Sequence, residues 1–334
     1  MTRGWQRPRV FRLARSFAQV PDRAADLSGL LRNHDTDLPF PRAWAELIQL
    51  GLIWGGSFLA IRTALDEIGP LTSVLFRTGI AALVLWPVIL WRGIALPRGW
   101  RTWRGLLVMG VLNNVIPFTL MAWGQLHIPS GLTSILNATT AIFGVLVAAA
   151  VFADERLTTR KALGVTLGFA GVVTAIGPAA LLSLDLTSTA QLAVIAGTFS
   201  YACAGAWARI HLRGLAPLAA AAGMLTSSTL VMAPLSLMTE GLPSLALSSA
   251  TWIGILYYAL IATALAYLLY YRVLAMAGAG NLMLVTLLIP PTAIALGALV
   301  RAEDLHPGAY AGLALLALGL CVLDGRLFRT AVRV

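Results

Sequence analysis

Residues 131–176 read GLTSILNATTAIFGVLVAAAVFADERLTTRKALGVTLGFAGVVTAI, and their pattern recurs without a gap at residues 279–324. In both copies an apolar run meets a glutamate, then a short polar turn, then a second apolar run with two glycines seven residues apart. A repeat of this length indicates a duplicated structural unit. The overlay pairs Glu155 with Glu303, Leu157 with Leu305, Gly164 with Gly312, and Gly171 with Gly319.

The composition of the chain places this unit in a membrane. Of 334 residues, 58% are hydrophobic and only 11% are charged, which is too few charged groups to cover a water-facing surface. A net charge of +10 would also suit a nucleic-acid-binding protein, but the basic residues do not gather on a soluble domain. Cys203 and Cys321 lie inside apolar runs, so neither a disulfide framework nor a metal site is expected. We therefore expect an all-α, multi-pass membrane protein without a cofactor.

Apolar runs of about 20 residues, the length that crosses ~30 Å of hydrocarbon, begin near Trp44. They predict ten transmembrane helices, five in a first repeat over residues 43–177 and five in a second over 188–325. Residues 1–42 are expected to form a basic tail without stable structure, and 326–334 a short basic tail. The predicted helices are 43–65, 70–91, 102–125, 129–152, 158–177, 188–211, 215–238, 250–272, 279–300 and 306–325.

The basic residues predict the orientation of these helices. Loops rich in Arg and Lys stay in the cytoplasm, and with both termini inside, all but three of the 24 basic residues lie on that side or in the tails. Because each half has an odd number of helices, the turns at Glu155 and Glu303 then face opposite sides. The repeats are therefore expected to be inverted copies, as in secondary transporters, whose site lies near the midplane between the halves. The three exceptions are Arg62, Arg77 and Arg301.

Four sequence features carry a family resemblance: the motifs Gly51-Leu52-Ile53-Trp54-Gly55-Gly56-Ser57-Phe58 and Leu75-Phe76-Arg77, and the patterns Glu155/Gly164/Gly171 and Pro290/Glu303/Gly312/Gly319. They resemble the EamA family of the drug/metabolite transporter superfamily. The resemblance covers about residues 45–325 and implies a ten-helix transporter built from two EamA units, but it implies no substrate. A proline that the family often has near Ala141 is absent here.

Polar side chains near the middle of the predicted helices are candidates for a solute site. Polar groups in hydrocarbon are costly unless they face protein or a water-filled cavity. Adjacent asparagines project about 100° apart, so Asn113 and Asn114 are not both expected to face one pocket. For each candidate, helix packing or interhelical hydrogen bonding is the alternative. The candidates for solute binding are Trp54, Asn113, Asn114, Asn137, Tyr201 and Tyr258.

Arg77 lies about 10 Å along its helix from Pro70, deeper than any other basic residue. Its side chain either snorkels to the outer surface or lies in an outer vestibule. In the vestibule it would pair with Asp66, with Glu67 or with the carboxylate of a solute.

Residues at the predicted helix ends have structural interpretations. Glu155 and Glu303 are each expected to cap the helix that follows, where a carboxylate favours the free amide groups. An interfacial aromatic belt is expected from Tyr267, Tyr270 and Tyr271.

Three prolines interrupt predicted helices near their middle. Pro117, Pro290 and Pro291 remove backbone hydrogen bonds, which gives either a hinge for alternating access or a static kink. They are the hinge candidates.

The residue inventory favours a carrier of small solutes. No carboxylate lies in the middle of a predicted helix, which disfavours a sodium site or a proton relay of the intramembrane carboxylate type. A neutral pocket lined by amides and aromatic rings suits amino acids or related amphipathic solutes. We expect a secondary transporter of the bacterial inner membrane, exporting such solutes, with lipid and solute but no nucleic acid as partners. The alternatives are a membrane-embedded sensor or an enzyme on the same fold; an enzyme would need a paired acid and base or metal ligands, and no such pairing is visible.

Overall fold

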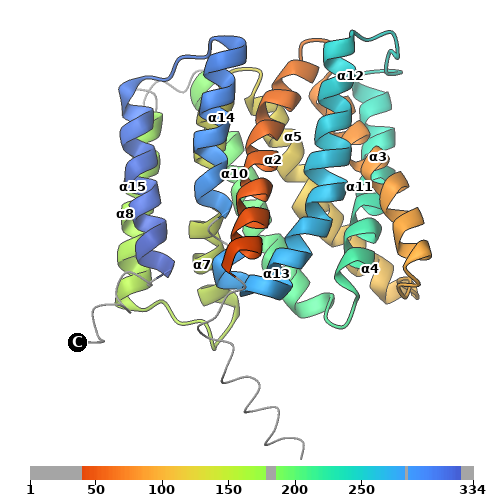
Figure 1. Cartoon of the computed structure of the whole chain (residues 1–334), viewed down its shortest axis with the longest axis horizontal. Coiled ribbons are helices and arrows are strands. Elements are labelled where there is room, and N and C mark those ends of the chain that lie inside the picture. Colours follow the sequence, from red (N-terminus) through yellow and green to blue (C-terminus); the bar gives the residue numbers. More distant parts are fainter. Residues whose placement is uncertain (1–39, 178–185, 283–284, 325–334) are drawn as a thin grey trace, which may run out of the picture. The chain divides into compact units, whose positions relative to one another are not determined.

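The computed structural model describes residues 40–177, 186–282 and 285–324, and every regular element in these ranges is a helix. The helices lie beside one another and run up and down (Figure 1). The expected all-α class is therefore confirmed for the described residues.

The first half of the chain contains two helices that are interrupted along their length. The elements are α2 (Phe40–Ala64), α3 (Pro70–Trp91), α4 (Trp100–Gly110), η2 (Val111–Val115), α5 (Ile116–Gly124), α6 (Ser130–Asn137), α7 (Thr140–Val151) and α8 (Thr159–Ile176). Here η2 is a π-helical turn that joins α4 to α5 in one rod.

The second half repeats this succession. Its elements are α10 (Leu186–His211), α11 (Pro217–Thr239), α12 (Ser249–Leu256), η3 (Tyr257–Leu265), α13 (Ala266–Leu282), α14 (Val285–Arg301) and α15 (Pro307–Asp324). A longer π-helical segment, η3, joins α12 to α13.

Within the part of the chain that the structure describes, seven helices are long and apolar enough to cross a membrane. A shorter apolar helix, α14, spans 17 residues. The first turn of α8 carries Arg160 and Lys161, and neither α8 nor α10 is among the seven. The ten predicted segments therefore have helical counterparts in the described residues, but their number of membrane crossings stays a prediction. The seven are Arg42–Ala64, Pro70–Trp91, Trp100–Gly124, Ser130–Val151, Pro217–Thr239, Ser249–Met276 and Pro307–Asp324.

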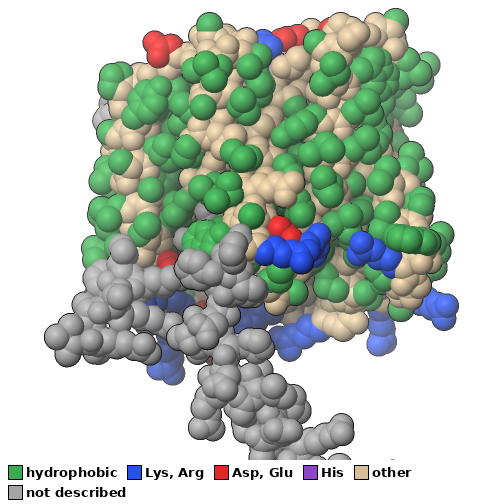
Figure 2. Space-filling model, in the orientation of Figure 1, with side chains coloured by type: hydrophobic (Ala, Val, Ile, Leu, Met, Phe, Trp, Pro, Cys, Tyr) green, Lys and Arg blue, Asp and Glu red, His purple; other side chains and the backbone are tan. Residues whose placement is uncertain are grey.

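Charged side chains collect at the two ends of the helices. Figure 2 shows hydrophobic side chains over the flank, with Lys and Arg gathered at its lower edge and Asp and Glu at its upper edge. We call the upper edge the acidic end; its carboxylates belong to Asp66, Glu67, Glu240, Glu303 and Asp304. We call the lower edge the basic end; its loops and helix ends carry Arg92, Arg98, Arg101, Arg156, Arg160, Lys161, Arg209, Arg213 and Arg272.

The glycines that the sequence repeat pairs meet at one contact, between α8 and α15, which lie side by side (Figure 1). A Cβ atom on Gly171 would lie 2.6 Å from the backbone nitrogen of Leu316 and 2.7 Å from the carbonyl oxygen of Gly312. A Cβ atom on Gly164 would lie 2.8 Å from the carbonyl oxygen of Gly319. Only glycine lets two helices approach so closely. We call Gly164, Gly171, Gly312 and Gly319 the glycine seam; it joins the last described helix of each half.

The helix predicted over residues 129–152 is interrupted between α6 and α7, although no proline stands there. The Thr139 hydroxyl donates to the carbonyl oxygen of Leu136 at 2.7 Å, and the Thr140 hydroxyl donates to that of Asn137 at 2.8 Å. Hydroxyl groups that bond local carbonyls in this way compete with the helical pattern. The break places Asn137 at the end of α6, inside the protein.

The Glu303 carboxylate caps a helix of the other half of the chain. It accepts hydrogen bonds from the backbone nitrogen of Ser130 at 2.8 Å and from the Ser130 hydroxyl at 2.9 Å, where α6 begins. A carboxylate at this position satisfies free amide groups and is favoured by the helix dipole. The expectation that Glu303 caps the helix that follows it, α15, is therefore wrong.

The repeat partner of Glu303, Glu155, forms ion pairs instead of a cap. Its carboxylate lies 3.0 Å from Lys161 Nζ and 3.6 Å from a guanidinium nitrogen of Arg209. The cap of α8 is the side chain of Thr158, which accepts from the backbone nitrogen of Lys161. The capping role expected for Glu155 is wrong too, because a nearer hydroxyl occupies that position.

Replacing Glu303 is expected to destabilise the protein. Glu303→Ala removes the partner of two donors at the start of α6, and loss of such a cap costs about 1–2 kcal/mol of unfolding free energy. Thermal unfolding of the purified protein measures the effect. Asp304→Ala is the matched control, because Asp304 is exposed and makes no ion pair with the described residues. Equal melting temperatures for the two variants would contradict the capping role.

Candidate functional site

The described helices enclose a cavity of about 700 Å³. Its wall is mostly apolar, and Arg77 is the one charged residue among the described residues that line it. The polar lining comes from α2, α3, η2, the end of α5, α6, α7, α10, η3, α13 and α14, so both halves of the chain contribute. It includes Ser57, Arg77, Asn113, Gln125, Asn137, Thr140, Tyr201, Thr263, Tyr267, Tyr270 and Tyr271.

The π-helical segment η3 supplies one polar corner of the cavity. A π-helical turn leaves carbonyl groups without their usual partners. Here the Thr263 hydroxyl donates to the carbonyl oxygen of Tyr258 at 2.7 Å, and the Trp54 indole donates to that of Ala262 at 3.1 Å. These bonds hold η3 against α2 and fix the direction of the Thr263 hydroxyl.

The turn η2 arises at Pro117. The backbone nitrogen of Ile116 donates to the carbonyl oxygen of Val111, five residues back. In the same register Pro117 would donate to Leu112, but proline has no N–H group. The Ser200 hydroxyl of α10 donates to the Leu112 carbonyl oxygen at 2.7 Å instead. Whether Pro117 acts as a hinge stays a prediction, as it does for Pro290 and Pro291, around which α14 remains helical.

Of the six solute-binding candidates, Trp54, Asn113, Asn137 and Tyr201 line the cavity. The side chains of Asn137 and Tyr201 make no hydrogen bond with the described residues, so their polar groups are available to a solute. Asn113 donates to the Tyr267 hydroxyl at 3.5 Å.

The other two candidates lie outside the lining. Asn114 is fully buried and donates to the Ser228 hydroxyl of α11 at 2.8 Å, an interhelical bond. Tyr258 is 0% exposed, and its hydroxyl accepts from that of Ser73 at 3.2 Å. The geometry gives both residues the packing role that was the alternative at each position.

The Arg77 side chain neither snorkels outward nor meets the acidic residues considered for it. Its Nε donates to the Thr263 hydroxyl at 3.0 Å, and its guanidinium carbon lies 3.9 Å from the centre of the Phe118 ring. Asp66 and Glu67 bond other groups, as described below. Arg77 therefore belongs to the cavity and not to an outer vestibule.

The tyrosines expected at the membrane interface line the cavity as well. Tyr267, Tyr270 and Tyr271 follow η3, whose wider turns rotate the face that α13 presents. The interfacial-belt interpretation is therefore wrong. The sequence placed these tyrosines near the end of a predicted helix, and that position does not say whether a side chain faces the cavity.

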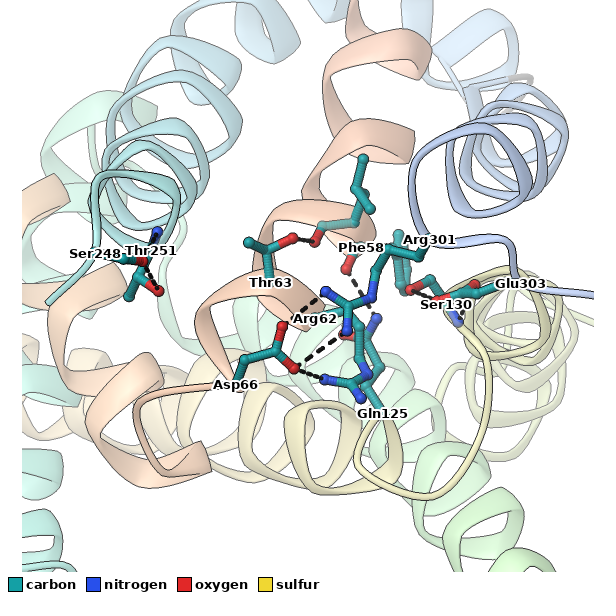
Figure 3. A network of polar contacts seen from close by, with 11 residues as sticks. Phe58, Arg62, Thr63, Asp66, Gln125, Ser130, Ser248, Thr251, Arg301 and Glu303 are labelled. Atoms are coloured by element: carbon teal, nitrogen blue, oxygen red, sulfur yellow. Dashed lines mark hydrogen bonds and ion pairs between the residues drawn. The ribbon is translucent and has the colours of Figure 1, made fainter.

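The cavity is closed toward the acidic end. Ile61 and Gln125 are the lining residues nearest that end, and they are only 8% and 1% exposed. Beyond them, the Asp66 carboxylate receives Arg62 at 2.7 Å and both terminal nitrogens of Arg301 at 2.8 and 3.2 Å (Figure 3). Gln125 donates to the carbonyl oxygen of Phe58 at 2.9 Å. We call Arg62, Asp66, Gln125 and Arg301 the acidic-end closure.

Ion pairing sets the charge state of the acidic-end closure. The hydrogen bonds from Arg301 and then Arg62 hold the pKa of the Asp66 carboxyl below its usual value, although partial burial opposes them. Hydrogen bonds from Ser248 likewise lower the pKa of the neighbouring Glu67, whose carboxylate accepts from the Ser248 backbone nitrogen at 2.8 Å. Both carboxylates are therefore ionised, and each joins the first half of the chain to the second.

Toward the basic end the cavity wall reaches exposed residues. Leu212 and Leu215 are half-buried, and Pro217, at the start of α11, is exposed. Ion pairs flank this region, and one of them joins Arg209 to Asp154 at 2.6 Å. The two ends of the cavity therefore differ.

The model of the EamA-like transporter family matches residues 46–177 and again residues 188–323. Two matches in succession agree with the repeat in the sequence. Together they cover well over half of the chain.

Several similar curated proteins have names that describe transport. A probable terminal-alkyne amino-acid exporter of Streptantibioticus cattleyicolor is 30% identical over 48% of this chain, although the alignment spans only 53% of the exporter. A probable amino-acid metabolite efflux pump of Salmonella typhimurium is 26% identical over 84% of this chain and 94% of its own length. An uncharacterized transporter of Archaeoglobus fulgidus is 25% identical over 84% of this chain and 98% of its own length.

A solved crystal structure shares the fold. It aligns with a TM-score of 0.63 over 86% of this chain and 98% of its own, at 17% identity. The repeat, the apolar helices, the central cavity and the two family matches agree. The chain belongs to the EamA-like transporter family of the drug/metabolite transporter superfamily and is a multi-pass membrane protein.

Proposed function

We propose that this protein is a secondary transporter that exports small metabolites, amino acids or related amphipathic solutes, across the bacterial inner membrane by alternating access. In this proposal the chain crosses the membrane ten times as two inverted five-helix repeats, and both termini lie in the cytoplasm. The basic end then faces the cytoplasm, as the distribution of Arg and Lys favours.

The observation that carries the proposal is a cavity between the halves that is closed at one end only. Alternating access requires a site that is open to one side while contacts seal the other. The acidic-end closure supplies the seal, and the exposed wall near Pro217 supplies the opening. With the basic end inside, this is the state in which an exporter receives its solute.

The lining suits a small amphipathic solute. Trp54, Phe58 and Ile289 offer apolar contact, while Asn137 and Tyr201 have polar groups without a hydrogen-bond partner in the described part of the chain. Pockets of this kind bind by apolar burial and use a few polar groups for orientation. The names of the amino-acid exporter and the efflux pump agree with such solutes.

Counterflow in proteoliposomes tests the proposal. We expect the protein to exchange at least one labelled solute from a panel of amino acids, N-acyl amino acids, sugars, amines and nucleosides. Trp54→Ala and Asn137→Ala are expected to lower the exchange rate at least about tenfold, because each removes a group that faces the cavity. Leu83→Ala is the matched control, since Leu83 is 74% exposed on the outside of α3.

Two results would count against the transporter. If folded protein exchanges no member of the panel, the sensor alternative gains support. If Leu83→Ala lowers exchange as much as Asn137→Ala does, the cavity is not the solute path.

A further inference from the structure

The Arg77 guanidinium lies in the cavity wall and forms no ion pair with a carboxylate of the described residues. An arginine side chain has five N–H donors, and only the one on Nε has a hydrogen-bond partner, Thr263, within residues 40–177, 186–282 and 285–324. No carboxylate of these residues lies within 4.0 Å of it, although the arginines of the acidic-end closure each have one. The four donors on the terminal nitrogens of Arg77 are therefore free of protein acceptors in the described structure.

The surroundings hold this guanidinium in place and give it no compensating charge. Nε is fixed by the Thr263 hydroxyl, which in turn is committed to the Tyr258 carbonyl oxygen. One face of the guanidinium lies on the Phe118 ring, and that ring also meets the Tyr201 ring edge to face, at 6.3 Å between centroids. The terminal nitrogens of the guanidinium thus keep their donors unused, and Tyr201, whose hydroxyl has no hydrogen-bond partner among the described residues, is near enough to interact electrostatically with Arg77.

An uncompensated charge in a mostly apolar cavity is unfavourable unless a counter-ion is supplied. The planar fork of arginine matches the two oxygens of a carboxylate, with which it forms paired hydrogen bonds. No described lining residue offers a negative charge to a second, cationic group of a solute.

We propose that Arg77 is the anion-binding residue of the cavity and that the preferred solutes are monoanionic carboxylates with an apolar remainder, ahead of zwitterions and of neutral or cationic analogues. This inference rests on the proposed transport function and names its substrate class. A bound monoanion brings the net charge of the site to zero. A bound zwitterion leaves it at +1, and its ammonium group must also lose its hydration.

Three probes with one side chain test the charge requirement. N-acetyl-L-leucine is a monoanion, N-acetyl-L-leucinamide replaces its carboxylate by a neutral amide, and L-leucine is a zwitterion. Binding to the purified full chain in lipid nanodiscs is measured by titration calorimetry and by the shift in melting temperature. We expect wild-type protein to bind the monoanion at least about tenfold more tightly than the amide, and more tightly than the zwitterion.

Three variants test whether Arg77 is the residue that causes this selectivity. Arg77→Gln is expected to bring the ratio of the two dissociation constants close to one. Arg77→Lys, which keeps the charge but not the fork, is expected to give an intermediate ratio. Arg101→Gln removes one positive charge at an exposed position of the basic end and is expected to leave the ratio unchanged.

The wild-type selectivity keeps the inference testable even if Arg77→Gln fails to fold. Equal binding of N-acetyl-L-leucine and N-acetyl-L-leucinamide by wild-type protein would overturn it, and so would folded wild-type protein that binds no N-acetyl-L-leucine. A ratio that is the same in Arg77→Gln as in wild type would also overturn it. Selective binding of the monoanion without counterflow would support the anion site and refute the transport function. Counterflow of neutral solutes that Arg77→Gln does not change would support the transport function and refute the anion site.

Discussion

Gly171→Leu is expected to abolish the accumulation of folded protein. A Cβ atom alone at this position would meet the backbone nitrogen of Leu316 at 2.6 Å and the carbonyl oxygen of Gly312 at 2.7 Å, and neither backbone atom can rotate away. Relief of the overlap requires α8 and α15 to separate, which removes the dispersion contacts along the glycine seam. Overpacking of this kind costs about 3 kcal/mol or more, a large part of a typical total stability.

Size-exclusion chromatography and thermal unfolding in detergent measure this effect. Gly144→Leu is the matched control, because Gly144 lies in α7 and, apart from the adjacent backbone of its own helix, no described atom lies within 4 Å of the position that its Cβ would take. The control is expected to remain monodisperse, with a change in unfolding free energy within about 0.5 kcal/mol. A folded Gly171→Leu protein as stable as this control would show that the helices do not depend on the seam.

Asp66→Arg is expected to open the cavity at the acidic end. The substitution removes the ion pairs with Arg62 and Arg301 and places three guanidinium groups together. Each exposed pair contributes up to about 1 kcal/mol, and like charges cost a similar amount, so the closed state loses about 2–3 kcal/mol. The population of protein open at this end should then rise about thirtyfold or more.

Cysteine labelling measures that population. In a background of Cys203→Ser and Cys321→Ser, Ile61→Cys places one thiol at the closed end of the cavity, and a membrane-impermeant reagent is added from the acidic side. The Ile61→Cys thiol is expected to react slowly when Asp66 is unchanged, about fivefold faster in the Asp66→Asn variant, and fastest in the Asp66→Arg variant. Combining Asp66→Arg with Arg301→Asp should slow it again, because one pair is rebuilt with reversed charges.

Asp304→Asn is the control for this experiment, since it removes a carboxylate of the same end that makes no ion pair with the described residues. Equal labelling rates of the Ile61→Cys thiol in the Asp66→Arg and Asp304→Asn variants would show that the ion pairs of Asp66 do not keep the cavity closed.

The low pKa of Asp66 predicts how the closure responds to pH. A carboxyl group whose pKa is lowered on folding contributes stability above its unfolded pKa, near 3.8, and loses it only as the pH falls through the lower folded value. The labelling rate of Ile61→Cys in the Cys203→Ser, Cys321→Ser background rises with pH because the thiolate is the reactive form, so it is divided at each pH by the rate for the same thiol in unfolded protein. This ratio should stay constant between about pH 5 and pH 8. A rise in the ratio across that range would place another titrating group in control.

The repeat in the sequence identified Gly164, Gly171, Gly312 and Gly319 as equivalent positions, but their meeting at one contact was not predicted, because a repeat does not say which helices are neighbours. The apolar runs of membrane length predicted the all-α class, since they leave few alternatives. The capping contact between Glu303 and Ser130 could not be predicted from the sequence. Ser130 lies in the other half of the chain, and a contact at that sequence distance leaves no local pattern.

The candidate site was predictable only in part, because position along a helix indicates depth in the membrane but not the direction of a side chain. Asn113, Asn137 and Tyr201 were predicted from their depth, and they line the cavity. By the same criterion Tyr258 was placed in the cavity and Tyr267 outside it, and both assignments were wrong. Thr263 carried no signal of its own, because its role depends on a carbonyl group that the π-helical turn leaves free.

The unpaired charge of Arg77 has an electrical consequence. A carrier that holds one fixed positive charge in its cavity is cationic when empty and neutral there when loaded with a monoanion. A charge that crosses the full membrane potential gains or loses about 2.3 kcal/mol per 100 mV. We therefore expect a potential that is negative inside to hold the empty carrier open to the cytoplasm while leaving the loaded carrier free to turn outward. Arg77 would then make the return of the empty carrier, and not the export step, the one that membrane voltage controls.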